Sequence, residues 1–252
     1  MLISFVIPAF NEEAYITNTL QQLHTALKSV EQTALSWEII VCNNNSSDCT
    51  AQLAKDMGAN VVFEPKNQIS KARNTGAATA KGDWLIFLDA DSYPNEGLLL
   101  EVVQIIKTDK HIGFGTTITV KDGSLFNKLR MERLNPFFRF FKFSGGVFLG
   151  CRKQDFETIE GFSDELYALE EFDFIFRLKQ LGKKSRKGFT VLHKHPVITS
   201  GRKGELKGSD LIRLMFSNVA AIILFILYYF LPGKLFSMIN SRFLGYWYKI
   251  RK

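Results

Sequence analysis

The sequence predicts a three-layer α/β fold in which a mostly parallel central sheet is covered by helices on both faces. Two observations lead to this prediction. Short apolar runs alternate with helix-like segments along the first half of the chain. Polar side chains also follow several of the apolar runs, as at the ligand-binding edge of a parallel sheet. With 252 residues, 46% of them hydrophobic, the chain has enough apolar material for one large buried core and an appendage.

The early elements can be placed from this alternation. Strands are expected at residues 2–8, 38–42, 60–64 and 84–88. Helices are expected from Asn11-Glu12-Glu13 to about Val30, from the Asn43–Asp48 loop through about Met57, and over 70–81. Three scattered cysteines, Cys42, Cys49 and Cys151, form neither a disulfide framework nor a zinc-ligand pattern, which favours a reducing compartment.

The excess positive charge is confined to the end of the chain. Residues 201–252 carry nine basic and two acidic side chains, a difference equal to the whole net charge of +7. The rest of the chain is neutral, and no nucleic-acid-binding motif occurs in it, so a nucleic-acid partner is not expected. Eighteen uncharged residues from Leu214 to Leu231 would span about 27 Å as a helix, close to the thickness of a bilayer core.

These features predict two parts. Residues 1–204 form the α/β body of the protein. Residues 205–252 form a hydrophobic and basic tail that either crosses the membrane or lies in one leaflet. The protein is expected at the membrane with the domain formed by residues 1–204 in the cytoplasm and without a signal peptide. Residues 124–143 mix aromatic and basic side chains, as in a membrane-surface segment, a groove for an apolar substrate, or a helix packed on the sheet.

Three clusters of residues carry the chemistry. Asp89 and Asp91 flank Ala90 directly after an apolar strand, where paired carboxylates can hold a divalent cation and a ribose hydroxyl. Lys71 and Arg73 open a helix rich in small residues and could donate to phosphate or base oxygens. Acidic side chains at 170, 171 and 173 open another helix and either cap it or supply a general base.

The order of these motifs resembles the family 2 glycosyltransferases, sugar-nucleotide-dependent enzymes with the GT-A fold, and in particular membrane-associated bacterial members. The resemblance covers about residues 3–203, and it implies that residues 1–204 are a catalytic domain with a nucleotide-binding half at about 1–115 and an acceptor half at about 116–204. It rests on Val6-Ile7-Pro8-Ala9-Phe10-Asn11-Glu12, the Asn43–Thr50 segment, Ala72-Arg73-Asn74 with Gly76, Asp89-Ala90-Asp91, Gly145–Leu149 with Gly161-Phe162, and Glu170-Glu171-Phe172-Asp173 with Arg177.

The resemblance implies a donor site and a metal site. Pro8, Ala9 and Glu12 would line the nucleotide pocket, Arg73 and Lys71 would contact the nucleotide, and Asp89 and Ala90 would meet the ribose. Asp91, with Asp89, would hold the Mn²⁺ or Mg²⁺ that bridges the diphosphate, and His195, with His193 nearby, could complete the metal shell. Asn43 stands where the family usually has an Asp that bonds uracil. Arg202 and Lys203, in Thr199-Ser200-Gly201-Arg202-Lys203, would clamp the diphosphate.

The resemblance also implies a reaction. Glu171 falls where the family has its catalytic Asp, with Asp173 in reserve and Glu170 as a third candidate. The expected reaction is metal-dependent transfer, with inversion, from a nucleotide-diphosphate sugar, here a UDP-sugar, to a hydroxyl of a lipid-linked or membrane-proximal acceptor. An alternative is an inactive nucleotide-sugar-binding or scaffold protein, which Asn43 and Glu171 would favour. A nucleotidyltransferase would carry a Gly-rich loop with a Lys after the first strand, where this chain has Pro8-Ala9-Phe10.

Overall fold

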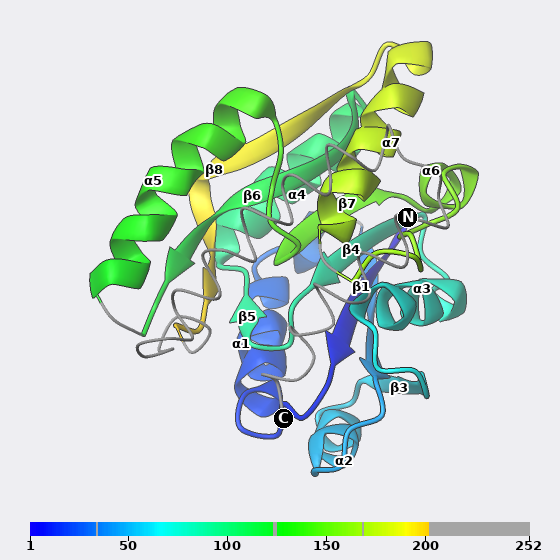
Figure 1. Cartoon of the computed structure of the whole chain (residues 1–252), viewed down its shortest axis with the longest axis vertical. Helices are drawn as coiled ribbons and strands as arrows, with labels where there is room; N and C mark the ends of the chain where they lie inside the picture. Colours follow the sequence, from blue (N-terminus) through cyan, green and yellow to red (C-terminus); the bar gives the residue numbers. More distant parts are fainter. Residues whose placement is uncertain (34, 123–124, 168, 202–252) are drawn as a thin grey trace.

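A computed structural model describes residues 1–201 except 34, 123–124 and 168, and shows one continuous eight-stranded sheet with helices on both faces (Figure 1). The elements in chain order are β1 Leu2–Ala9, α1 Ile16–Lys28, a 3₁₀ turn Glu31–Thr33, β2 Ser36–Asn43, α2 Thr50–Asp56, β3 Asn60–Phe63, α3 Ile69–Thr79, β4 Trp84–Leu88, β5 Ser92–Tyr93, α4 Glu96–Thr108, β6 His111–Val120, α5 Leu125–Phe141, β7 Phe148–Arg152, α6 Lys153–Thr158, α7 Glu170–Ser185 and β8 Gly188–Thr199.

The four strands and three helices expected before residue 90 all form. The strand order is β3-β2-β1-β4-β7-β6-β8-β5, and β3, β2, β1 and β4 run parallel to one another. Because β1 lies between β2 and β4, the chain leaves β1 toward one side of the sheet and later returns on the other. The carboxyl ends of β1 and β4 therefore border the crevice where α/β sheets bind ligands.

The second half of the sheet adds two reversed strands to the predicted mostly parallel arrangement, and six of the eight strands run in one direction. β7 is inserted antiparallel between β4 and β6, and β5 is antiparallel to β8, so the sheet is mixed. β7 follows β6 through α5 and lies beside it in the opposite direction. Strand periodicity specifies which face a side chain occupies and not the direction of its neighbour, so the sequence pattern did not show this reversal.

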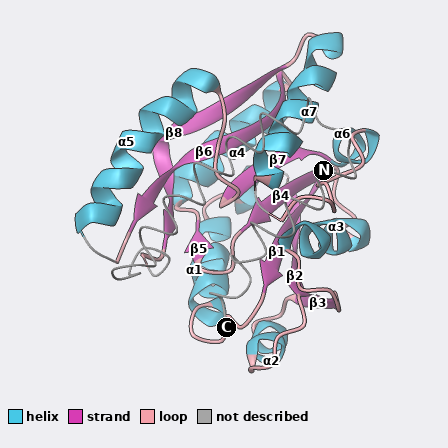
Figure 2. Ribbon diagram, viewed as in Figure 1, coloured by secondary structure: helices cyan, strands magenta, loops and turns pink. Residues whose placement is uncertain are grey.

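The predicted three layers are present (Figure 2). One apolar core lies between the sheet and the α1, α4 and α5 side, with Ile3, Phe5 and Ile7 of β1 pointing into it. The other core contains Val6 of β1 and packs against α3, α6 and α7. The alternation along β1 therefore buries both faces of the sheet.

The structure does not test two of the predicted features. The tail, residues 205–252 with the apolar segment 214–231, lies outside the described residues. Among the helices of the described ranges, none is long and apolar enough to cross a membrane. The division at about residue 115 stays a prediction, and that residue lies within β6.

The second core depends on an aromatic cluster around Phe87. Its ring centroid lies 4.9 Å from that of Phe162 in an edge-to-face contact and 5.4 Å from that of Phe156. Phe87→Leu should lower the free energy of unfolding by about 1–2 kcal/mol, because it loses aromatic contacts that contribute about 0.5–1.5 kcal/mol beyond area burial. Urea denaturation would measure this.

Phe63→Leu is the matched control, because Phe63 is 57% exposed at the edge of the sheet. It should change the unfolding free energy by less than about 0.5 kcal/mol. Equal effects of the two substitutions would contradict the assignment of Phe87 to the core.

Candidate active site

A pocket opens at the carboxyl ends of β1 and β4, where the sheet topology places a ligand site. Six residues expected to bind the nucleotide sugar or metal come together there: Pro8, Ala9, Glu12, Asp89, Ala90 and Asp91. Four further residues that sequence reasoning did not select also line it: Phe10, Asn44, Asn67 and Ile69.

The turn that carries Asp89 and Asp91 is held from three directions. The backbone N–H of Asp89 donates to the carbonyl of Val147 at 3.1 Å, and that of Ser92 donates back to the carbonyl of Asp89 at 3.1 Å. The Thr19 hydroxyl on α1 donates to the carbonyl of Ala90 at 2.8 Å. These bonds fix the turn, so its carboxylates are positioned before any ligand arrives.

Asp91 is 4% exposed, and both of its carboxylate oxygens accept hydroxyl hydrogen bonds. The Ser92 hydroxyl donates to Oδ1 at 3.2 Å and the Ser200 hydroxyl to Oδ2 at 2.9 Å. The backbone N–H of Ser200 also donates to the Asp91 carbonyl at 3.1 Å. Ser200 was part of the predicted diphosphate loop, but its contact with Asp91 spans 109 positions and had no local signal.

The oxygen donors of the pocket suit a hard divalent cation. Carboxylates from Glu12, Asp89 and Asp91 all line it, which is the ligand chemistry of Mg²⁺ or Mn²⁺. Within the described ranges no three His, Cys, Asp or Glu side chains form a metal-binding group by themselves. Mg²⁺ is commonly held by one or two carboxylates together with substrate phosphates, so the residues fit a cation shared with a diphosphate.

Two neighbouring loops are joined at the mouth of the pocket. Asn11 has a left-handed backbone, with φ of 51°, which Asn tolerates better than most residues. Its side-chain carbonyl accepts from the N–H of Ser47 at 2.9 Å, and its own N–H donates to the Ser46 hydroxyl at 3.0 Å. The N–H of Glu12 donates to the Thr50 hydroxyl at 2.7 Å. The β1–α1 and β2–α2 loops therefore hold each other in place.

The asparagines at the end of β2 have different structural roles. Asn43 Oδ1 accepts from the N–H of Ser46 at 3.0 Å and shapes the loop. Asn44, and not Asn43, lines the pocket. Its Nδ2 donates to the Lys66 carbonyl at 2.6 Å. Asn67 Nδ2 in turn donates to the Asn44 carbonyl at 2.7 Å. Three consecutive asparagines look alike in the sequence, so only the structure distinguishes their positions.

Arg73 is only 2% exposed, and it binds protein groups at the base of the site. Its guanidinium forms an ion pair with Glu170 at 2.8 Å and with Asp89 at 3.4 Å, and it donates to the Gly146 carbonyl at 3.1 Å. Burial alone would lower the pKa of Arg73, but Glu170, Asp89 and Glu171 together raise it. A Cβ on Gly146 would lie 2.5 Å from the guanidinium, so this close approach requires glycine.

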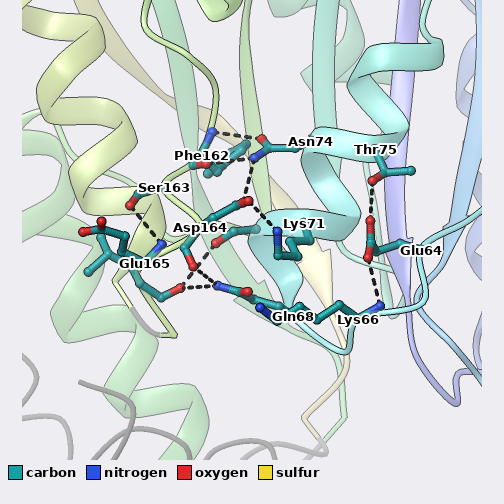
Figure 3. A network of polar contacts seen from close by, with 12 residues as sticks. Glu64, Lys66, Gln68, Lys71, Asn74, Thr75, Phe162, Ser163, Asp164 and Glu165 are labelled. Atoms are coloured by element: carbon teal, nitrogen blue, oxygen red, sulfur yellow. Dashed lines mark hydrogen bonds and ion pairs between the residues drawn. The ribbon is translucent and has the colours of Figure 1, made fainter. Parts of the chain in front are cut away.

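Lys71 also contacts protein. Its ammonium group pairs with Asp164 at 2.6 Å, and Asn74 donates to the Phe162 carbonyl at 2.8 Å and accepts from the Phe162 N–H at 2.9 Å. Gln68 donates to the Asp164 carbonyl at 2.7 Å. Figure 3 shows these side chains reaching from α3 to the 162–165 segment. One face of α3 thus anchors the segment that leads into α7.

The N-terminus of α7 presents its three acidic residues differently. Glu170 is buried against Arg73, and Asp173 is buried and paired with Arg177 at 2.6 Å. Glu171 is half-buried. Burial raises the pKa of Glu171, the charge of Glu170 raises it further and Arg73 opposes both, giving a shift from 4.5 to about 8. A large fraction of Glu171 is therefore protonated near neutral pH.

The remaining predicted site residues lie away from the pocket or outside the description. His195 Nδ1 contacts the Glu101 carboxylate at 2.7 Å beside α4, and His193 Nδ1 contacts the Val191 carbonyl. Neither is among the residues that line the pocket beside Asp91. Arg202 and Lys203 fall in the part of the chain that the structure does not describe.

Comparison with known proteins gives the family. The family described as glycosyl transferase family 2 matches residues 4–158, more than half of the chain. The chain belongs to glycosyl transferase family 2. An uncharacterized glycosyltransferase of Haemophilus influenzae is 25% identical over 199 residues, covering 71% of this chain and 62% of the relative.

Other relatives match over shorter stretches. The Escherichia coli enzyme UDP-Glc:alpha-D-GlcNAc-diphosphoundecaprenol beta-1,3-glucosyltransferase WfgD is 25% identical over 132 residues, half of each chain. The 4,4'-diaponeurosporenoate glycosyltransferase of Staphylococcus haemolyticus is 37% identical over 108 residues, 40% of this chain and 27% of the relative. The chain spans less than two thirds of the length of these relatives.

Solved structures confirm the GT-A-like fold. Staphylococcus aureus TarS 1-349 in complex with UDP-GlcNAc aligns with a TM-score of 0.60 at 20% identity, covering 97% of this chain and 72% of TarS. Glucosyl-3-phosphoglycerate synthase from Mycobacterium tuberculosis, in complex with Mn²⁺, UDP and glucosyl-3-phosphoglycerate, aligns with a TM-score of 0.61 at 18% identity, covering 89% and 78%. At these identities the likeness concerns the fold.

The buried position of Arg73 predicts a large loss of stability on its removal. Arg73→Met leaves Glu170 and Asp89 without their shared cation, so it should lower the free energy of unfolding by about 3–5 kcal/mol. Lys71→Met, on the same helix, removes a partly exposed pair and should cost less than about 1 kcal/mol. Urea denaturation of both variants gives the comparison, and a smaller effect for Arg73→Met would contradict the buried network.

Proposed function

We propose that this protein is an inverting, metal-dependent glycosyltransferase that moves a sugar from a nucleotide-diphosphate sugar, a UDP-sugar, to a hydroxyl of a lipid-linked or membrane-proximal acceptor. The observation that carries the proposal is the pocket at the β1 and β4 ends, where Asp89 and Asp91 stand on a rigid turn. Membership of glycosyl transferase family 2 supports the reaction class.

The donor and acceptor are proposed from the relatives. WfgD is named for a UDP-glucose donor and a diphosphoundecaprenol-linked acceptor, and TarS is solved with UDP-GlcNAc. In this chain, residues 201–252 hold the apolar segment and nine basic residues expected of a membrane-associated tail. We place the protein at the membrane with the catalytic domain in the cytoplasm, which agrees with the free cysteines Cys42, Cys49 and Cys151.

The donor side of the reaction uses the acidic turn. Asp91 and Asp89 would hold Mn²⁺ or Mg²⁺, and the bound cation would neutralise charge on the leaving diphosphate. Structural neighbours are solved with Mn²⁺ or Mg²⁺, which supports this choice. The Ser92 and Ser200 hydroxyls orient Asp91, and Pro8, Ala9 and Ala90 give the pocket an apolar wall beside its carboxylates.

The acceptor side uses Glu171. As the acceptor hydroxyl oxygen bonds to the anomeric carbon, the bond from that carbon to the diphosphate breaks and the hydroxyl proton passes to the Glu171 carboxylate. Attack from the face opposite the leaving group in one displacement inverts the anomeric centre. A carboxyl group whose pKa lies near 8 titrates close to the working pH, and once it is ionised its carboxylate is basic enough to accept the hydroxyl proton, which suits a general base.

Replacing the carboxylate at the metal position should abolish transfer. Asp91→Asn is expected to reduce Mn²⁺-dependent nucleoside diphosphate release from a panel of sugar nucleotides by about 100-fold or more, since a charge-stabilising group is lost. Asp56→Asn, on the exposed end of α2, is the matched control and should leave release unchanged. Full activity of Asp91→Asn would refute the site, and a wild-type protein inactive on every donor would favour a binding or scaffold role.

Replacing the proposed base, Glu171, should lower the rate of transfer without weakening donor binding. Glu171→Gln is expected to lower kcat by about 10²–10⁴-fold while the donor dissociation constant stays within a factor of about two. In the wild type kcat/KM should rise with pH up to about 8, because the base must lose its proton. Steady-state kinetics and donor titration would measure these effects.

Glu157→Gln, on the exposed side of α6, is the control for this substitution. If turnover persists in Glu171→Gln, the base is Asp173 or Glu170, and the same substitution at each position decides between them.

A further inference from the structure

Helix α5 carries an unusual concentration of exposed apolar side chains. Of the eight large hydrophobic residues that are exposed in the described part of the chain, five lie on this helix. Phe140 is the most exposed of all, at 81%. We define the phenylalanine patch as Leu134, Phe137, Phe140 and Phe141. Apolar groups gathered in this way mark a surface that contacts something other than water.

The patch is the outer face of a helix whose inner face is firmly attached. Asn135 accepts from the N–H of Ile118 and donates to its carbonyl, both at 3.0 Å, so it pairs with β6 as a strand residue would. Phe138 is buried in the core, and Met131 packs against it. Positions 131, 135 and 138 follow helical spacing on the inner face, and 134, 137 and 141 follow it on the other. The exposed rings therefore lie on a face of α5 that does not pack against the core.

The rings of the patch contact one another. Phe137 and Phe141 have centroids 4.5 Å apart, and those of Phe140 and Phe141 are 5.0 Å apart. Figure 1 shows α5 at the outer margin of the molecule beside β6 and β8. The patch is thus one contiguous apolar surface on a rigid support.

The segment that carries this surface is rich in basic residues. Residues 128–142 contain five basic side chains, Lys128, Arg130, Arg133, Arg139 and Lys142, and a single acidic one, Glu132. An open groove between α5 and β8 is lined by Phe140 together with Arg139, Lys142 and His193. An apolar ring beside several cations matches the boundary between phospholipid headgroups and acyl chains.

The charges decide between the possible occupants. A second copy docked on the same patch through a two-fold axis would bring like basic groups together, which costs affinity. The tail of this chain, residues 202–252, carries nine basic residues and only Glu205 and Asp210, so its charge does not complement the basic residues of α5. An anionic bilayer supplies both the apolar layer and the negative charge.

We propose that the phenylalanine patch of α5 inserts into the interface of an anionic phospholipid membrane and docks the catalytic domain on it. The inference builds on the membrane-proximal acceptor proposed above and names the surface responsible. α5 ends at Phe141, and five residues later the Gly146 carbonyl accepts from the buried Arg73. The docked helix is therefore directly connected to the base of the active site.

Phe140→Trp tests the insertion in the full-length protein. Vesicles of phosphatidylglycerol and phosphatidylcholine with brominated acyl chains quench tryptophans that enter the interface. Phe63→Trp is the matched control, because Phe63 is also exposed but lies on β3 at the opposite edge of the sheet from β8 and β5. Phe140→Trp should show extra quenching and a blue shift relative to wild type, and Phe63→Trp should show neither. Equal quenching of the two variants would overturn the proposal, even where the tail alone holds the protein on the vesicle.

A second variant measures what the patch contributes to binding. Phe137→Ser with Phe140→Ser should weaken partition onto the anionic vesicles about tenfold or more, since it removes two apolar side chains from the interface. Unchanged partition would contradict the inference. A change in the molar mass of the vesicle-free protein, by light scattering, would instead assign the patch to a second copy.

Nucleoside diphosphate release is measured on the same variants. Release that persists while insertion fails rejects the docking surface alone. Absent release with normal insertion rejects the proposed transferase activity alone.

Discussion

The site depends on the ion pairs and the hydrogen bond that the buried guanidinium of Arg73 makes. Arg73 lies on α3 and joins the Asp89 turn, the Gly146 segment before β7 and the start of α7 through Glu170. Two carboxylates buried so close together would repel each other and lose hydration without this cation. The ion pairs and the bond to Gly146 therefore hold the Asp89 turn and the start of α7 in one frame. Catalysis by positioned groups requires that their relative placement persists between turnovers.

The early fold and the acidic turn could be predicted because their signals are local. Each of the first four strands is a short apolar run followed by polar residues and a helical segment, and Asp89-Ala90-Asp91 directly follows the strand that buries it. The reversal of β7, the Ser200 contact with Asp91 and the pairing of Arg73 with Glu170 were missed. Arg73 and Glu170 are 97 positions apart, and a basic residue near a helix start looks the same whether it later faces solvent, nucleotide or a carboxylate.

Acidic side chains and exposed aromatic side chains are found in different parts of the molecule. The pocket gathers Glu12, Asp89 and Asp91, whereas α5 gathers basic and aromatic side chains around Phe140. Negative groups suit a cation and its diphosphate, and the mixture on α5 suits a phospholipid interface. The two hydrogen bonds between Asn135 and Ile118 attach α5, and with it the phenylalanine patch, to β6 of the sheet that also carries the pocket.

The contact between Ser200 and Asp91 has a mechanical consequence. Ser200 follows β8 directly and is bonded to Asp91 through both its hydroxyl and its backbone N–H. The end of β8 is thus attached to the acidic turn of the candidate pocket through Asp91. A shift of the backbone at Ser200 would therefore change both hydrogen bonds to Asp91 at once, which ties the end of β8 to a carboxylate 109 positions earlier in the sequence.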